Sequence, residues 1–264
     1  MIVGICGGTG SGKTFLAERL ARALGAEVAV RVEQDWYYRP AEAGTTAEER
    51  LRRNYDVPEA LDNDRLVRDL TALRGPVETR ALRPSPGPSL EGRGVGAGTL
   101  GVPTETRALR PSPGPSLGGR GVQSGTPEQG HAIQAPKYSF EVCDRVPGYH
   151  AVPWRPVVIV EGILIFAREA LRKVFDLKVF VEADEEVRIG RRLERDVAQR
   201  GRDRQEVLRR YAEQVREAYT LYIEPYRCEA DVVVHNNRND QGLPAEFDTL
   251  VEWIRARHAL KATE

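Results

Sequence analysis

The stretch GGTGSGKT spans Gly7 to Thr14 and follows the apolar run MIVGIC at the start of the sequence. It matches the pattern G-x-x-x-x-G-K-[ST], with a strand-like segment before it and an amphipathic helical segment, residues 13–24, after it. Glycines at these positions let backbone N–H groups turn inward around phosphate oxygens, and the N-terminus of the helix adds positive potential. The stretch therefore predicts a phosphate-binding loop that joins a buried strand to a helix.

The residue types of the loop indicate a nucleoside triphosphate bound with a metal ion. Lys13 would reach the β and γ phosphates, and the Thr14 hydroxyl would ligate Mg²⁺. A second acid follows the buried run VVIVEG, which delivers Glu161 to the carboxyl end of a strand, where it would face the metal. The predicted nucleotide contacts of the loop are Gly7, Gly8, Thr9, Gly10, Ser11, Gly12, Lys13 and Thr14.

The rest of the chain alternates between strand and helix patterns, which is typical of a parallel sheet covered by helices on both faces. We therefore expect an α/β fold in three α/β/α layers, built on a mainly parallel sheet. The predicted strands are residues 2–6, 28–33, 157–160, 177–182 and 231–235, and the predicted helices are residues 13–24, 62–73, 184–200, 204–223 and 244–258.

One segment breaks this alternation. ETRALRPSPGPSLEGRGVGAGT (residues 78–99) recurs as ETRALRPSPGPSLGGRGVQSGT (residues 105–126), and the copies differ only at three of their 22 positions, 91/118, 96/123 and 97/124. This proline- and glycine-rich composition is typical of disorder, so we expect residues 76–129 to be a low-complexity insertion within a single domain, 1–264. Docking of PSPGP as a polyproline helix on a partner is the alternative.

The 264 residues include 39 basic and 39 acidic side chains, and this balance gives no bulk argument for binding nucleic acid or a membrane. No apolar run approaches the roughly 20 residues of a membrane-spanning helix. The three cysteines are odd in number and widely spaced, as in a reducing compartment. The composition predicts a soluble intracellular protein of the cytoplasm.

A candidate acceptor site follows the second predicted strand, in the run EQDWYY (residues 33–38). Asp35 would lie at the strand end near the phosphates, where a carboxylate can accept the proton of an attacking hydroxyl. The neighbouring aromatic residues would flank a planar or sugar group. A helix-capping aspartate among core aromatic residues is the alternative for this run.

Five further motifs stand in an order that, together with the phosphate loop, resembles the uridine–cytidine kinase family. They are DWYY (35–38), NYDVPEALD (54–62), PKYSF (136–140), EGIL (161–164) and RRLERDVAQRGR (191–202). The resemblance runs from residue 2 to about residue 234 and skips the repeat. It implies a P-loop kinase with a small acceptor-binding hairpin, which phosphorylates the 5′-hydroxyl of uridine or cytidine in pyrimidine salvage. The implied donor is ATP or GTP with Mg²⁺, and the implied assembly is a homotetramer.

The resemblance also implies a role for individual side chains. Asp35 would be the general base on the 5′-hydroxyl, and Asp56 would accept hydrogen bonds from the ribose 2′ and 3′ hydroxyls. Residues 191–210 would form a lid with a hinge at Gly201, although the same arginine run on an isolated helix would simply be a solvated face. The remaining implied contacts are Tyr38, Tyr55, Tyr138 and Phe140 around the nucleoside, Arg192 at the sugar, and Arg195, Arg200 and Arg202 over the phosphates, with Lys13 and Arg195 assisting the transfer.

Three positions depart from the pattern of this family. Ser139 stands where the family has aspartate, Cys143 where it often has a histidine that reads the pyrimidine, and Arg210 where some members have glutamine. The identity of the base is therefore open, and sister kinases of nicotinamide riboside, phosphoribulose or pantothenate remain alternatives. A nucleotide-binding scaffold that has lost catalysis is the alternative from another class.

Overall fold

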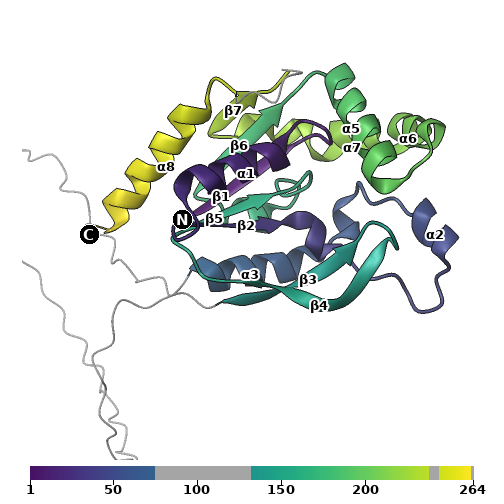
Figure 1. Cartoon of the computed structure of the whole chain (residues 1–264), viewed down its shortest axis with the longest axis horizontal. Helices are drawn as coiled ribbons and strands as arrows, with labels where there is room; N and C mark the ends of the chain where they lie inside the picture. Colours follow the sequence, from purple (N-terminus) through teal and green to yellow (C-terminus); the bar gives the residue numbers. More distant parts are fainter. Residues whose placement is uncertain (75–131, 238–243, 263–264) are drawn as a thin grey trace, which may run out of the picture. The chain divides into compact units, whose positions relative to one another are not determined.

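The computed structural model describes residues 1–74, 132–237 and 244–262 of the chain (Figure 1). These residues belong to one compact unit, formed by residues 1–76 and 128–264. A second unit, residues 77–127, holds both copies of the repeat. The predicted insertion at residues 76–129 therefore lies outside the described residues.

The central sheet has five parallel strands in the order β2-β5-β1-β6-β7. Their bounds are β1 (Ile2–Gly7), β2 (Ala29–Glu33), β5 (Val157–Glu161), β6 (Leu177–Glu182) and β7 (Val232–His235). Every residue of β1 and β5 is buried, because both strands lie inside the sheet with helices on each face. The parallel sheet expected from the sequence is confirmed.

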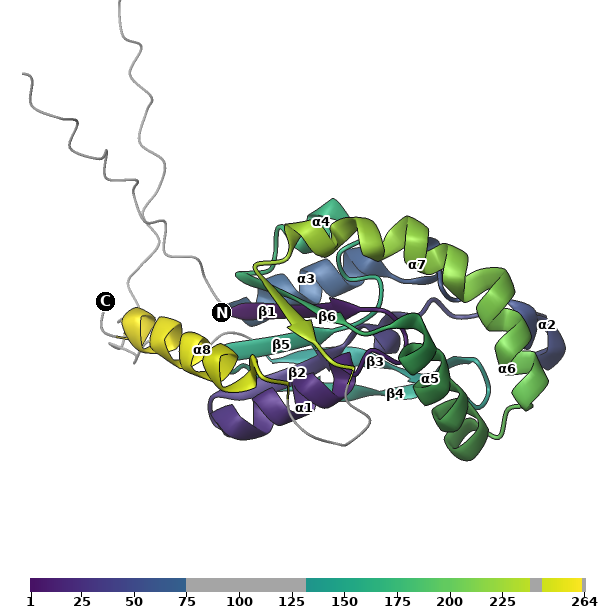
Figure 2. The same cartoon turned by 90° about the horizontal axis from the view of Figure 1, so that it is seen from above.

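Helices cover both faces of this sheet. Their bounds are α1 (Lys13–Leu24), α2 (Ala47–Arg52), α3 (Asn63–Arg74), α4 (Glu169–Arg172), α5 (Glu185–Arg200), α6 (Arg204–Arg210), α7 (Arg216–Tyr222) and α8 (Phe247–Ala262). Figure 2 shows the strands between α1 and α8 on one side and α3, α4 and α7 on the other. The three-layer α/β/α arrangement expected from the alternating pattern is confirmed.

Each face has its own hydrophobic core. On the first face, Leu16 and Leu20 of α1 and Ile254 of α8 pack with inner strand residues such as Val179. On the second, α3 contributes the fully buried residues Leu66, Leu70 and Leu73, which pack with Ile2, Val158 and Phe180 of the sheet. The two cores fix the strands, so the loops at their carboxyl ends are held on a rigid base.

A small antiparallel hairpin of β3 (Ile133–Ser139) and β4 (Asp144–Val152) lies beside the sheet, with a register irregularity between Pro136 and Lys137. The small hairpin implied by the family resemblance is present, although the sequence pattern does not mark β4 because most of this strand is exposed or half-buried. Cys143 closes the turn in the left-handed region, at φ 51°.

The predicted lid region consists of α5, a break and α6. Gly201 ends α5 in the left-handed conformation with φ 60°, and the Asp203 side chain accepts a hydrogen bond from the Glu206 amide to begin α6. The helix predicted for residues 204–223 is present but contains a π-helical turn at Tyr211–Val215. Within the described parts of the chain, no helix has the length and apolar character needed to cross a bilayer.

Candidate active site

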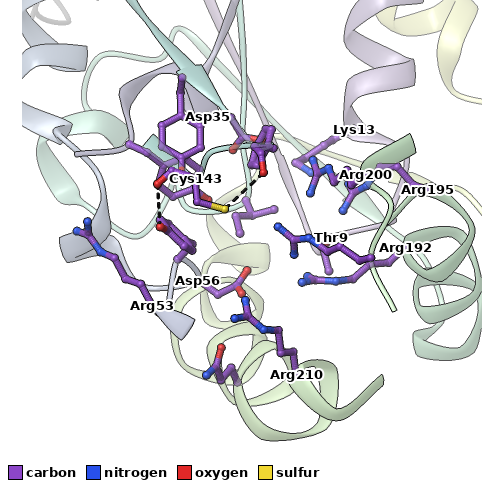
Figure 3. Close-up of a pocket in the computed structure, with 17 residues that line it drawn as sticks. Thr9, Lys13, Asp35, Arg53, Asp56, Cys143, Arg192, Arg195, Arg200 and Arg210 are labelled. Carbon is purple, nitrogen blue, oxygen red and sulfur yellow. Dashed lines mark hydrogen bonds between the residues drawn. The ribbon is translucent and has the colours of Figure 1, made fainter. Parts of the chain in front are cut away.

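A pocket opens between the carboxyl ends of the strands, the β3–β4 hairpin and the helices α5 and α6 (Figure 3). It brings together residues from segments far apart in the sequence, and most of the predicted site residues are among them. The lining comprises Thr9, Lys13, Asp35, Tyr38, Arg53, Tyr55, Asp56, Tyr138, Phe140, Cys143, Ile163, Arg192, Arg195, Arg200, Arg202, Arg210 and Gln214.

The phosphate loop has the backbone shape that its glycines predict. Gly12 has φ 94°, and a Cβ there would lie 2.1 Å from Nδ2 of Asn236, so a larger residue would force the loop to move. Asn236 is buried, and its Nδ2 donates a hydrogen bond to the carbonyl oxygen of Ser11 at 2.8 Å. Arg191 Nη1 donates to the Asn236 carbonyl at 3.0 Å. The loop is thus braced by the end of β7 and by α5.

Thr14 and Glu161 form the pair on which a metal ion would bind. Thr14 Oγ1 donates a hydrogen bond to Glu161 Oε1 at 3.0 Å, and Glu161 is buried at the end of β5. Burial raises the pKa of Glu161 to about 7, and the charge of Lys13 offsets only part of that effect. Within the described residues no group of three or more His, Cys, Asp or Glu side chains could hold a metal. A hydroxyl and one carboxylate beside a phosphate loop fit Mg²⁺, which takes most of its other ligands from water and phosphate oxygens.

Two carboxylates, Asp35 and Asp56, line the acceptor part of the pocket. Asp35 lies in the one-turn helix Gln34–Tyr37 directly after β2, where the sequence places it. Burial raises the pKa of Asp56, the charge of Arg192 lowers it, and the charge of Asp35 raises it again. The two carboxylates are therefore close enough to interact, with a guanidinium beside them.

Four aromatic rings form one wall beside these acids. The Tyr38 ring centroid lies 5.0 Å from that of Tyr138 and 5.4 Å from that of Tyr55. Tyr138 and Phe140 meet edge to face at 5.3 Å. The guanidinium of Arg200 lies 3.9 Å from the Phe140 ring centroid, so the end of α5 contacts the turn of the hairpin. Such a wall suits a planar, uncharged group.

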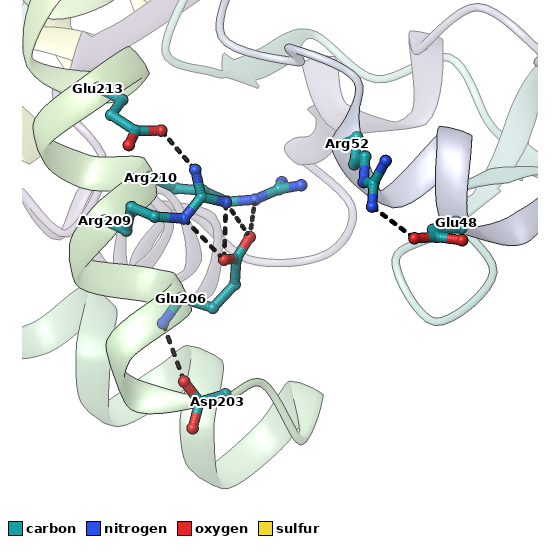
Figure 4. Close-up of polar contacts among 7 residues, drawn as sticks. All are labelled: Glu48, Arg52, Asp203, Glu206, Arg209, Arg210 and Glu213. Atoms are coloured by element: carbon teal, nitrogen blue, oxygen red, sulfur yellow. Dashed lines mark hydrogen bonds and ion pairs between the residues drawn. The ribbon is translucent and has the colours of Figure 1, made fainter.

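The structure changes the interpretation of the three departures. Cys143 and Arg210 both line the pocket, whereas Ser139 does not. The Ser139 hydroxyl instead accepts a hydrogen bond from the Glu141 amide at 3.3 Å within the hairpin turn. Arg210 Nε donates to Glu206 Oε1 at 2.7 Å, a contact drawn in Figure 4. Of the three departures, only Cys143 and Arg210 therefore face the pocket.

Several site residues are missed by the sequence analysis. Arg53 and Gln214 line the pocket, Asn236 supports the loop, and Asp196 pairs with the lid arginines. Gln214 follows Arg210 by four residues, so helical spacing on the predicted helix was a usable signal. The position of Asn236 depends on the packing of β7 in the sheet, and no motif in the neighbouring sequence indicates it.

A phosphate-binding loop and a pocket with two carboxylates lie at the same edge of a parallel sheet, with four arginines of residues 192–202 beside them. This arrangement is that of a P-loop kinase, that is, a phosphotransferase. The model of the phosphoribulokinase / uridine kinase family matches residues 126–241. The chain is 30% identical over 263 residues to a uridine kinase of Chloroflexus aurantiacus, covering 100% of this chain and 97% of the relative. It is 32% identical over 234 residues to a uridine kinase of Brevibacillus brevis, covering 89% and 84%. The chain belongs to the phosphoribulokinase/uridine kinase family.

A solved structure described as a putative fructose transport system kinase from Silicibacter sp. matches with a TM-score of 0.56 and 18% identity, covering 88% of each chain. The phosphoribulokinase from Rhodobacter spheroides matches with a TM-score of 0.50 and 16% identity, covering 89% of this chain and 69% of that one. These similarities show the shared fold.

Proposed function

We propose that this protein transfers the γ-phosphoryl group of ATP to the 5′-hydroxyl of a pyrimidine ribonucleoside, uridine or cytidine. The observation that carries the proposal is that Lys13 of the phosphate loop and both acceptor-side carboxylates, Asp35 and Asp56, line one pocket. A donor phosphate at Lys13 and a hydroxyl at Asp35 would share that cavity, as transfer between bound reactants requires.

On the acceptor side, Asp35 acts as the general base that takes the proton of the 5′-hydroxyl. Asp56 accepts hydrogen bonds from the 2′ and 3′ hydroxyls, because a carboxylate can receive both donors of a vicinal diol. Arg192 lies beside Asp56 and contacts the sugar. A vicinal diol is present in ribosides and absent from pantothenate, so Asp56 favours a riboside.

On the donor side, the backbone N–H groups of residues 7–14 bind the phosphates and Lys13 contacts the β and γ groups. Arg195, Arg200 and Arg202 offset the charge that develops on the phosphoryl group as it is transferred. Mg²⁺, held by Thr14 and Glu161, would supply further charge neutralisation at the phosphates. GTP is the alternative donor, since the loop contacts the phosphates and not the base.

The aromatic wall, Tyr38, Tyr55, Tyr138 and Phe140, receives the base. Cys143, a weak hydrogen-bonding group, and Arg210 decide which base is preferred. Nicotinamide riboside and ribulose phosphate are therefore included as acceptors in the test. A scaffold without catalysis is disfavoured, because the Thr14–Glu161 contact and the pocket carboxylates are in place.

A coupled assay of ADP release tests this proposal with uridine, cytidine, nicotinamide riboside, pantothenate and ribulose 5-phosphate as acceptors. We expect turnover with a pyrimidine riboside and a loss of at least 10²-fold in kcat for Asp35→Asn, at the lower end of what a general base contributes. Glu33→Gln is the matched control, since Glu33 ends β2 outside the pocket and pairs with Arg31 at 3.2 Å. Turnover of pantothenate or ribulose 5-phosphate alone would refute the riboside assignment.

The setting of this activity is part of the same proposal. We assign it to pyrimidine salvage in the cytoplasm, within a single kinase domain whose lid is residues 191–210. The homotetramer implied by the family resemblance remains a prediction, which sedimentation of the full chain would check.

A further inference from the structure

A buried carboxylate pairs with the arginines of the lid. Asp196 lies on α5 with a side chain that is 0% exposed, and it is absent from the pocket lining. The arginines that pair with it, Arg192, Arg195, Arg200 and Arg202, all line the pocket. The carboxylate therefore contacts the arginines without facing the cavity itself.

The two oxygens of Asp196 divide these arginines into pairs. Oδ1 lies 2.9 Å from both Nε and Nη2 of Arg195 and 3.3 Å from Nη1 of Arg200. Oδ2 lies 3.5 Å from Nε of Arg192 and 4.0 Å from Nη1 of Arg202. The shorter contacts go to Arg195 and Arg200, so the carboxylate holds these two guanidiniums most firmly.

The backbone of the same residue fixes the break between α5 and α6. The amide groups of Gly201 and Arg202 both donate to the Asp196 carbonyl oxygen, the second at 3.0 Å. The backbone carbonyl of residue 196 thus accepts the two hydrogen bonds that end α5 between Arg200 and Arg202, while its carboxylate contacts the side chains of both arginines.

The positive charges of the four arginines are partly balanced by the carboxylate of Asp196. Four guanidiniums gathered at one place repel one another. Without the negative charge of Asp196, their side chains would turn toward water. Burial raises the pKa of Asp196, but the charges of Arg195, Arg200 and Arg192 outweigh burial and hold the pKa below its ordinary value. Burial, with the charge of Arg195, lowers the pKa of Arg200 to about 10. At neutral pH the Asp196 carboxylate is therefore ionised and the Arg200 guanidinium is protonated.

We propose that Asp196 is a positioning residue for phosphoryl transfer, whose charge keeps the lid arginines preassembled where negative charge develops on the phosphoryl group. The inference rests on the proposed function for the contact of Arg195 and Arg200 with phosphate. Bound phosphate shares these guanidiniums with Asp196, so the carboxylate restrains ground-state binding while it preserves their orientation. Preassembled donors stabilise a transition state because they need no reorganisation as the charge develops.

Asp196→Asn tests the proposal, since it keeps the size of the side chain and removes its charge. We expect kcat to fall at least 20-fold while KM for MgATP rises by no more than twofold, because the freed arginines still attract the phosphates. Asp196→Glu keeps the charge and displaces it, so kcat should fall only three- to tenfold. Glu194→Gln is the matched control, because Glu194 is an exposed carboxylate on the same helix, and its kcat should stay within twofold of wild type.

Three results would overturn the proposal. They are a kcat of Asp196→Asn within threefold of wild type, a rise in KM for MgATP at unchanged kcat, and a loss in Glu194→Gln equal to that in Asp196→Asn. Circular dichroism checks folding, and if Asp196→Asn does not fold, a wild-type kcat in Asp196→Glu would contradict the positioning role. Slow hydrolysis of MgATP without acceptor should fall by the same factor in Asp196→Asn. That readout needs no riboside, so it separates failure of this inference from failure of the proposed function.

Discussion

Replacement of Glu161 by glutamine is expected to stabilise the metal-free protein above neutral pH and to remove its response to Mg²⁺. The side chain is 5% exposed at the end of β5, and its Oε1 accepts the Thr14 hydroxyl. Glutamine keeps that acceptor and the side-chain volume while removing the buried charge. The perturbation therefore isolates the free energy of ionising this one group.

The magnitude follows from the pKa of Glu161, which burial raises from 4.5 to about 7. A carboxyl whose pKa is raised on folding binds its proton more tightly in the folded state, so its stabilising contribution is present at low pH. That contribution is lost as pH rises through about 7. At about 1.4 kcal/mol for each unit of pKa difference, the raised pKa of Glu161 costs about 3 kcal/mol of stability at pH 8, where the group is ionised, and about 1 kcal/mol at pH 5, where the folded protein must keep it protonated.

Urea unfolding in the presence of EDTA measures this difference at pH 5 and pH 8. Glu161→Gln should exceed wild type by about 3 kcal/mol at pH 8 and by about 1 kcal/mol at pH 5. Glu194→Gln, an exposed carboxylate on α5, should match wild type at both values. Added Mg²⁺ should strengthen ADP binding to wild type and leave binding to Glu161→Gln unchanged. A difference in stability that does not grow with pH would refute the reasoning.

Three further predictions concern the loop and the hairpin. Gly12→Ala places a Cβ 2.1 Å from Asn236 Nδ2 at φ 94°, so MgADP should bind at least tenfold more weakly by calorimetry, and unchanged binding would contradict the loop geometry. Asn236→Ala removes the 2.8 Å hydrogen bond to the Ser11 carbonyl, worth about 1 kcal/mol, so MgADP affinity should fall about fivefold while the nucleoside KM is unchanged. Cys143→His introduces a stronger hydrogen-bonding group on a left-handed residue, which histidine tolerates, and kcat/KM for uridine relative to nicotinamide riboside should rise about tenfold or more. An unchanged ratio would show that Cys143 does not face the base.

The sequence predicts the sheet well because its inner strands are short apolar runs with helices between them. VVIV at residues 157–160 reads as a buried strand, and its carboxyl end places Glu161 beside the phosphate loop. The same logic places Asp35 after β2. The carboxyl ends of parallel strands lie at one edge of the sheet. Active-site residues that follow these strands can therefore be predicted from the sequence.

Three other elements of the fold do not follow from the sequence pattern. The strand β4 lacks a clean alternation because most of its residues are exposed or half-buried, and α2 is a six-residue helix without a buried side chain. The π-helical turn at Tyr211–Val215 has no marker in the pattern that predicts one continuous helix. The strand β4 is placed by its pairing with β3, whereas α2 begins at a local capping box formed by Thr46 and Glu49.

Asp196 shows the limit for the site itself. In the run RRLERD its carboxylate resembles one member of an exposed helical ion pair, and only the folded chain shows that it is fully buried among four arginines. The sequence contains the charges of the lid, and their mutual arrangement depends on the turn at Gly201. The sequence gives the type and spacing of these residues, whereas the burial of Asp196 depends on how the whole chain packs.

Transfer of label from [γ-³²P]ATP to uridine or cytidine tests the central claim most directly, with the product separated and its phosphorylated position determined. We predict one nucleoside 5′-monophosphate for each ADP released, and its formation at least 10²-fold more slowly by Asp35→Asn. Label found only in inorganic phosphate, or on a 2′ or 3′ hydroxyl, would contradict it.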